Sequence, residues 1–340
     1  MPKDLQEAMF WTRERGKVKC NLCVKGCLIP EGKVGYCLVR KNIGNKLYST
    51  NYSKVVATDV DFIEKKPFFH FYPNSNTLSV SCSGPVLTSQ FSELWQITHD
   101  KLPIVSEKEY SPEDIITLAE KRNCKSITFT YIEPTVYFEF MYRTFKLAHR
   151  SNIKTTLVTN GYMTEDPVKK LCKYLDAVSF SVKASMDIEY MKKFTVLQDE
   201  NHIYDTLKIF KKHRAHIEIS NLIIPQIGDN IGLCEKLADW INGELGGDVP
   251  FHLLQFIPDP SLTELPQTPM STLERCAEVS RKAGLRYVYI SNVPQHQDES
   301  TYCYNCRETL IYRLASTVKK VNLVKDRCPN CGVRINLVVS

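Results

Sequence analysis

The chain has 340 residues, of which 43% are hydrophobic and 24% charged, and its formal net charge is +6. This composition is normal for a globular protein with a hydrophobic core and excludes a disordered chain. No apolar run is long enough for a transmembrane helix, and the charged start MPKDLQEAMFWTRERGK has no hydrophobic signal segment. We therefore expect a cytoplasmic protein without a membrane partner.

Positive charge is concentrated at the two ends of the chain. Residues 1–54 have a net charge of +7 and residues 301–340 one of +5, so the region between them is acidic, at −6. Basic clusters of this kind favour a polyanionic partner such as RNA. The alternative is that these charges are solvated and only keep the ends soluble.

Eight of the 13 cysteines form two groups, one near each end. Without an export signal, metal binding is favoured over disulfides. The spacings are Cys20-x2-Cys23-x3-Cys27-x9-Cys37 and Cys303-x2-Cys306-x21-Cys328-x2-Cys331. The paired C-x2-C spacing of the second group is typical of a zinc ribbon, in which four thiolates surround one ion. We expect two structural zinc sites, and iron–sulfur ligation stays open for the less regular first group.

Short β-rich runs alternate with amphipathic stretches through the middle of the chain. The predicted strands are 77–82, 126–130, 154–159, 177–182, 216–224, 250–257 and 286–291. The predicted helices are 111–122, 137–150, 165–175, 202–214, 230–243 and 271–283. Such alternation predicts an α/β protein with a parallel sheet. Ser111 and Asp114 are expected to cap the first helix, and Gly247 and Gly284 to end later ones.

The length of this middle region limits the kind of sheet. It is too short for a full eight-fold barrel, and no glycine-rich phosphate loop follows the first strand. We expect a partial (β/α)6–7 TIM-type barrel flanked by two small cysteine-rich metal modules. The predicted domains are a basic module with a linker (1–76), the barrel (77–295) and a zinc ribbon (296–340).

Several phrases resemble one family. They are CNLCVKGCLIPEGKVGYCLVRKN, IEKKPFFHFYP, FTYIEPT, LVTNGYMT, TPMSTLERCAEVSRKAGLRYVYISN and TYCYNCRETLIYR. They are similar to AmmeMemoRadiSam-type radical SAM proteins, relatives of the pyruvate formate-lyase activating enzymes. The resemblance implies a partial TIM barrel with a [4Fe–4S] cluster that cleaves S-adenosylmethionine. In that family a C-x3-C-x2-C loop after the first strand holds three irons, and the fourth iron binds the cosubstrate.

This chain departs from the family at that loop. Aligned on Trp95, the three cysteine positions are Pro85, Ser89 and Ser92, and Cys82 is the only thiol nearby. Proline offers no ligand atom and serine binds iron poorly. The fourth-strand phrase, here 181–183, and the sixth-strand phrase, here 254–258, are also altered. These departures predict lost radical chemistry on a retained scaffold.

Three residues match a family binding position. The resemblance implies that Glu133 would hold the methionyl amino group and that Asn160 and Gly161 would border the same pocket. The alternative, which the missing cluster favours, is that Asn160-Gly161 is a turn and Glu133 caps the next helix.

Two functions remain open. The first is a non-catalytic binding or scaffold protein that docks on RNA or a ribonucleoprotein through its basic ends, with no protein partner indicated. The residues concerned are Arg13, Arg15, Lys17, Lys19 and Lys25, with Phe10, Trp11 and Tyr36 for stacking, and Lys319, Lys320, Lys325, Arg327 and Arg334. The second is an enzyme that uses an iron–sulfur cluster at the first cysteine group, or a polar reaction at Cys82, Glu133 and Lys183. The missing loop cysteines favour the first.

Overall fold

The computed structural model describes residues 5–84, 108–197, 199–258 and 265–339. It divides into two compact units. The first contains residues 1–60, 77–178 and 191–215, and the second residues 61–76, 179–190 and 216–340. No described helix is long and apolar enough to cross a lipid bilayer.

The first unit contains a parallel β/α region. Its strands are β7 (Lys54–Phe62), β8 (Asn76–Cys82), β9 (Lys108–Glu109), β10 (Ser126–Phe129) and β11 (Lys154–Thr159). Its helices are α2 (Pro112–Lys121), η2 (Pro134–Tyr137), α3 (Phe138–Arg150), α4 (Glu165–Leu171) and α6 (Asn201–Lys212). Strand β10 pairs in parallel with both β8 and β11. Both β8 and β10 are almost completely buried, as expected for parallel strands covered on both faces.

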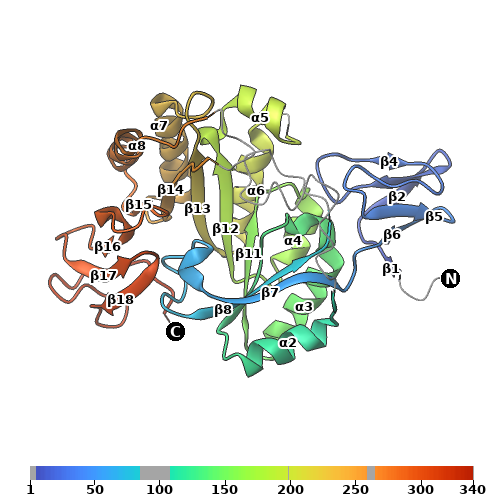
Figure 1. Cartoon of the computed structure of the whole chain (residues 1–340), viewed down its shortest axis with the longest axis horizontal. Coiled ribbons are helices and arrows are strands. Elements are labelled where there is room, and N and C mark those ends of the chain that lie inside the picture. Colours follow the sequence, from blue (N-terminus) through green and yellow to red (C-terminus); the bar gives the residue numbers. More distant parts are fainter. Residues whose placement is uncertain (1–4, 85–107, 198, 259–264, 340) are drawn as a thin grey trace. The chain divides into compact units, whose positions relative to one another are not determined.

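Local sequence explains where α2 and α3 lie. Ser111 and Asp114 form the predicted capping box at the start of α2, where Ser111 Oγ accepts from the Asp114 backbone N–H at 3.1 Å. Helix α3 buries Phe138, Met141 and Phe145, which recur on one helical face. Figure 1 shows α2 and α3 next to each other in the first unit.

Two small antiparallel sheets form the N-terminal module of this unit. Their strands are β1 (Gln6–Glu7), β6 (Lys46–Ser49) and β5 (Arg40–Ile43) in one sheet, and β2 (Trp11–Glu14), β3 (Lys17–Cys20) and β4 (Leu28–Ile29) in the other. A buried ion pair joins the module to α3, because Arg40 donates to both carboxylate oxygens of Glu139 at 2.8 and 2.7 Å. The Met9 backbone N–H also donates to Glu139.

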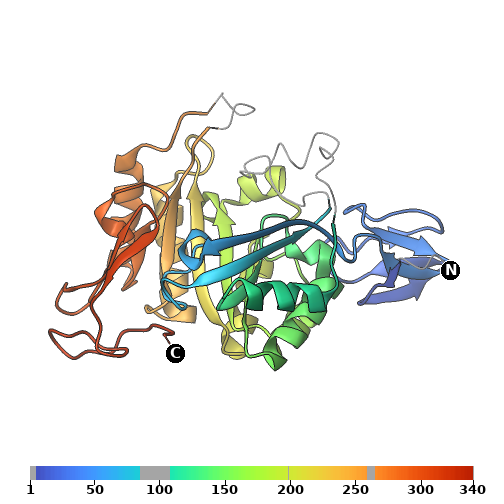
Figure 2. The ribbon, with the colours of Figure 1, turned by 60° about the horizontal axis from the view of Figure 1, so that its bottom comes forward.

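The second unit contains the remaining β/α elements. Its strands are β12 (Ala177–Lys183), β13 (His216–Ile223), β14 (Phe251–Gln255), β15 (Val288–Ile290), β16 (Thr301–Tyr302), β17 (Thr309–Leu314) and β18 (Thr317–Val321). Its helical elements are η1 (Ile63–Lys65), η3 (Ala184–Met186), α5 (Ile188–Phe194), α7 (Ile231–Trp240), η4 (Ile241–Leu245), α8 (Met270–Lys282) and η5 (Gln297–Glu299). Strands β13, β14 and β15 are parallel, whereas β16, β17 and β18 form an antiparallel sheet near the C-terminus (Figure 2).

A buried carboxylate organises the core of the second unit. Glu218, on β13, is fully buried and accepts from the backbone N–H groups of Phe69 and His70, both at 2.8 Å. The side chains of His216 and His252 donate to the same carboxylate at 3.0 and 2.8 Å. The segment 63–72, predicted as a linker, is therefore part of the core.

The predicted α/β class with a parallel sheet is confirmed, and each predicted strand and helix has a counterpart. Three details differ from expectation. The α7 region continues into a π-helical turn and ends at Gly246, whose φ of 103° suits glycine, instead of at Gly247. Helix α5 was not expected, and β7 replaces the start of the predicted linker. The three-domain division stays a prediction.

Candidate functional site: two cysteine groups and a buried turn

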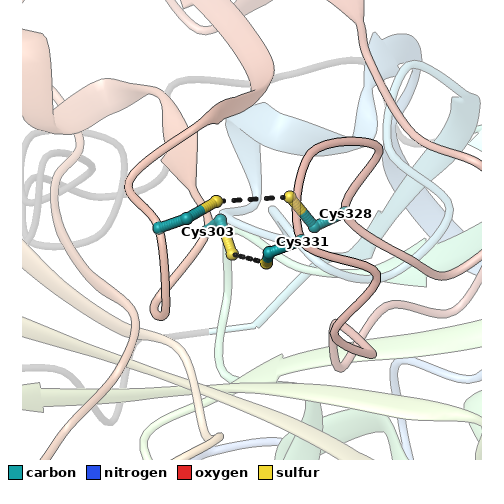
Figure 3. A group of neighbouring side chains, drawn as sticks. Cys303, Cys328 and Cys331 are labelled. Atoms are coloured by element: carbon teal, nitrogen blue, oxygen red, sulfur yellow. Dashed lines mark hydrogen bonds between the residues drawn. The ribbon is translucent and has the colours of Figure 1, made fainter.

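The C-terminal cysteines form a compact four-thiol group. The Sγ atoms of Cys303, Cys306, Cys328 and Cys331 all lie within 4.8 Å of one another. The Cys303–Cys331 and Cys306–Cys328 sulfur pairs are each 3.6 Å apart (Figure 3). A tetrahedral zinc site with Zn–S bonds of about 2.3 Å needs sulfurs about 3.8 Å apart. The group can therefore bind one metal ion with little movement.

Two turns of the same design present these thiols. In the first, the Cys303 N–H donates to the Glu308 carbonyl and the Arg307 N–H to the Cys303 carbonyl. In the second, the Cys328 N–H donates to the Val333 carbonyl and the Gly332 N–H to the Cys328 carbonyl. Arg307 and Gly332 both have positive φ, at 65° and 71°. The C-x2-C repetition in the sequence thus corresponds to two equivalent knuckles of a ribbon.

The N-terminal cysteines line one pocket of the first unit. This pocket is small and partly open to solvent. Its lining includes the four thiols Cys20, Cys23, Cys27 and Cys37, together with Arg40, Thr135 and Val136. No three of these thiols, all of them described residues, converge to the 4.8 Å spacing of the C-terminal group.

Burial keeps several of these thiols protonated when no metal is bound. It raises the pKa of Cys23 to about 12 and also raises the pKa values of Cys20 and Cys37. The Arg40 guanidinium opposes this effect at Cys20 and Cys37, because its positive charge favours the thiolate. A metal bound in the pocket would take the place of these protons.

Glu133, Asn160 and Gly161 come together at the C-terminal ends of β10 and β11. Glu133 is only 2% exposed. One carboxylate oxygen accepts from Thr135 Oγ1 at 2.6 Å and Thr159 Oγ1 at 2.7 Å, and the other from the Asn160 backbone N–H at 2.8 Å and its Nδ2 at 3.1 Å. Gly161 has a φ of 78°, as a turn requires. Glu133 also caps η2 by accepting from the Thr135 backbone N–H. These contacts form a capped turn, and the binding role of the three residues stays a prediction.

One neighbour of this turn was missed in the sequence. His202, on α6, has its Nε2 2.8 Å from the Gly161 carbonyl oxygen, and burial lowers its pKa. A single histidine on a helix face gives no spacing signal, so only the fold could place it there. The N-terminal module borders the same turn, because the Thr164 N–H donates to the Leu22 carbonyl and the Val24 N–H to the Tyr162 carbonyl.

The loop that would hold the family cluster lies outside the described residues. This applies to Pro85, Ser89, Ser92 and Trp95. The thiol before this loop, Cys82, ends β8, is fully buried and has its pKa raised well above the usual value by that burial. The donor set of this loop, one buried thiol with a proline and two serines, does not fit a cluster that needs three thiolates.

Comparisons with known proteins agree with the fold. The model of the Radical SAM superfamily matches residues 97–241. An uncharacterized protein of Methanocaldococcus jannaschii is 38% identical over 338 residues, which is 98% of this chain and 100% of the relative. The (2S)-3-sulfopropanediol dehydratase activating enzyme of Klebsiella oxytoca is 28% identical over 138 residues, 40% of this chain and 43% of that enzyme. Among solved structures, a radical SAM methyltransferase from Sphaerobacter thermophilus superposes with a TM-score of 0.50 and 13% identity, over 93% of this chain and 81% of that one.

Proposed function

Because this chain belongs to the radical SAM superfamily, we propose that it keeps the superfamily's scaffold but not its cleavage of S-adenosylmethionine, and that it acts by binding a polyanionic partner. The superfamily implies S-adenosylmethionine and an iron–sulfur cluster. The family loop of this chain lacks the three thiols that such a cluster needs. We assign zinc to the C-terminal ribbon, whose sulfur spacing suits one ion.

The observation that carries the proposal is the state of Glu133. Two carboxylate oxygens offer about four lone-pair directions. Five donors, from Thr135, Thr159 and Asn160, already point at them. No direction is left for the amino group of a bound cosubstrate, so the residue holds the turn instead.

Replacing Glu133 with glutamine tests this assignment. The amide would face the Asn160 or threonine donors with an NH2 group, so we expect a loss of roughly 1–3 kcal/mol in unfolding free energy. Urea unfolding measures the loss, and Glu113→Gln, at an exposed site on α2, is the matched control. Titration calorimetry should detect no binding of S-adenosylmethionine to the wild type or to Glu133→Gln. An unchanged stability together with tight cosubstrate binding that Glu133→Gln abolishes would contradict the assignment.

RNA is the partner that the exposed charges favour. On the ribbon, Tyr312 of β17 is exposed and stands opposite Lys320 of β18, next to exposed Lys319. On the N-terminal module, Tyr36 is 59% exposed and Lys25 lies 4.7 Å from its ring centre. An aromatic ring beside a lysine can stack on a base and neutralise a phosphate.

Salt dependence tests the RNA proposal. A fluorescent single-stranded RNA should bind the full chain, and its affinity should fall steeply as salt rises. The variant Lys319→Gln/Lys320→Gln should flatten the log–log slope by about 1.4, since each phosphate contact contributes about 0.7. The variant Lys121→Gln/Lys146→Gln loses the same charge at exposed sites of α2 and α3 and should keep the slope. Equal slopes in both variants, or no binding at low salt, would contradict the proposal.

A second candidate, an enzyme, is favoured by one contact. Thr135 donates to Glu133 and also lines the N-terminal cysteine pocket, so a metal there would border the turn that contains Glu133. If an enzymatic activity is found and is unchanged in Cys37→Ser, a metal in the N-terminal pocket takes no part in it.

A further inference from the structure

The two cysteine groups differ in spacing, and the difference distinguishes the metals that fit. On a single tetrahedral ion, the four sulfurs are neighbours, as in the C-terminal group. In a four-thiolate [4Fe–4S] cluster each thiolate binds a different iron, so the cysteine sulfurs stand farther apart. The N-terminal thiols share one pocket but do not converge. Their arrangement therefore differs from the compact single-ion group at the C-terminus.

Loop contacts pack closely behind the thiols of the N-terminal pocket. The Cys20 N–H donates to the Cys27 carbonyl at 2.9 Å, and the Gly35 N–H donates to the Arg40 carbonyl at 2.8 Å. A β-carbon at Gly35 would lie 3.1 Å from the Ile29 side chain and 3.6 Å from Cys27 Sγ. The loops are therefore packed closely behind the thiols, and closing them around one ion would require this packing to change.

An unsatisfied hydrogen-bond donor borders the same pocket. Arg40 is 1% exposed, and its two terminal nitrogens are engaged by Glu139. Its Nε is buried and has no partner among the described residues, although Arg40 lines the pocket. A buried donor without an acceptor costs roughly 1–3 kcal/mol, so it calls for an explanation. Sulfur atoms of a metal cluster are hydrogen-bond acceptors, and a cluster in this pocket would offer such acceptors beside Arg40.

We propose that this pocket holds an iron–sulfur cluster and that the Arg40 Nε–H donates a hydrogen bond to one of its sulfur atoms. The ligands are Cys20, Cys23, Cys27 and Cys37. Four thiolate ligands leave no iron with an open coordination position, so this cluster cannot cleave S-adenosylmethionine. The inference replaces the zinc expected at this site from sequence and does not depend on the RNA partner or on the state of Glu133.

Metal loading of the full chain tests the proposal. The chain is purified without air, loaded with ferrous iron and sulfide, and analysed for iron, sulfide, zinc and visible absorbance. We expect iron and sulfide in equal amounts, a broad charge-transfer band and one zinc per chain. Cys37→Ser should lose iron and keep zinc, whereas Cys331→Ser should lose zinc and keep iron. Iron that persists in Cys37→Ser, or two zinc and no iron in the wild type, would overturn the proposal.

A cobalt titration keeps the proposal testable if Cys37→Ser does not fold. The metal-free wild-type chain should bind one Co²⁺ per chain with the absorption of a tetrahedral four-thiolate site, at the C-terminal group. Two such ions per chain would mean that the N-terminal pocket is also a single-ion site, and the proposal would be wrong. S-adenosylmethionine binding is measured separately, so failure here leaves the proposed function untouched.

Replacing Arg40 with lysine tests the proposed hydrogen bond to the cluster. Arg40→Lys keeps a positive charge beside Glu139 but has no Nε–H group. If the hydrogen bond exists, the cluster of this variant, compared with the wild type per bound iron, should have a lower reduction potential and a shifted electron paramagnetic resonance spectrum after reduction with dithionite. Identical potentials and spectra in the two proteins would remove the hydrogen bond from the proposal.

Discussion

Replacing Cys328 with serine is expected to remove the C-terminal metal ion and to unfold the ribbon around it. Cys328 is 2% exposed and packs in a small core with Cys303, Leu310 and Ile335. That core is small, and structural zinc supplies on the order of 10 kcal/mol of apparent binding energy in comparable modules. The change should lower zinc content by one ion per chain and expose the amides of residues 301–337 to hydrogen exchange.

Cys124→Ser is the matched control for this experiment. Cys124 is 8% exposed and lies outside both cysteine groups, so its loss removes a buried thiol without touching a ligand. Zinc content and ribbon exchange should then equal those of the wild type. Unchanged zinc in Cys328→Ser would show that the compact four-thiol group is not a metal site.

Replacing Glu218 with glutamine is expected to lower the unfolding free energy by about 3–5 kcal/mol, the range for breaking a buried charged network. Its carboxylate accepts four hydrogen bonds, two of them from the backbone at Phe69 and His70. An amide offers one acceptor oxygen, so some of these buried donors lose their partner. Urea unfolding measures the effect. Glu235→Gln, on the exposed side of α7, should cost less than about 0.5 kcal/mol.

The same network predicts a loss of stability in acid. Burial lowers the pKa of His70 to about 3, and it also lowers the pKa of His252. A histidine in the unfolded chain takes up a proton near pH 6.5. Each of the two should therefore lower the unfolding free energy by about 1.4 kcal/mol per pH unit as the pH falls from 6.5 toward its pKa in the folded protein.

Burial acts to raise the pKa of Glu218, but hydrogen bonds from His216 and His252 outweigh it and hold that pKa well below normal. Its contribution is present above about pH 4.3 and is lost further into acid.

A urea series between pH 7 and pH 4 measures this dependence. The unfolding free energy of the wild type should fall as the pH drops below about 6.5. The Glu218→Gln variant should already have a lower unfolding free energy at pH 7. A stability that stays level between pH 7 and pH 5 would contradict the buried neutral state of the two histidines.

A hydrogen-bonded chain explains why the segment after β7 is buried. Because the Asn336 carbonyl only accepts, His70 carries its proton on Nδ1, 2.6 Å away, and its Nε2 accepts from Tyr289 Oη at 2.6 Å. Thr301 Oγ1 lies 2.9 Å from Tyr289 Oη and accepts from Arg313. Arg313 also donates to the Phe69 carbonyl at 2.8 Å, so the segment and the ribbon are held by the same buried contacts.

The sequence predicted regular elements better than it predicted these contacts. Periodicity located the strands and helices, and Ser111 with Asp114 marked the start of α2, because such signals are local. The partners of Glu218 lie up to 149 residues away, and nothing in the phrase KKPFFHFYP reveals a carboxylate on β13. The unit boundaries likewise depend on long-range packing.

The cysteine groups show the same limit. The C-x2-C pairs predicted the compact C-terminal group because each pair is a local turn. For the N-terminal group, the spacing identified the four thiols but could not show that Arg40 and Thr135 line their pocket. Similarly, the family resemblance pointed to Glu133, and only the fold revealed how fully its oxygens are occupied.

The most direct test of the central claim is an assay for reductive cleavage of S-adenosylmethionine. The full chain, loaded with iron and sulfide without air, is mixed with dithionite and S-adenosylmethionine, and methionine and 5′-deoxyadenosine are quantified. We expect no product above the protein-free control, even when iron is bound at the N-terminal pocket. Formation of 5′-deoxyadenosine in proportion to the protein would contradict the loss of cleavage and would establish an open iron in this chain.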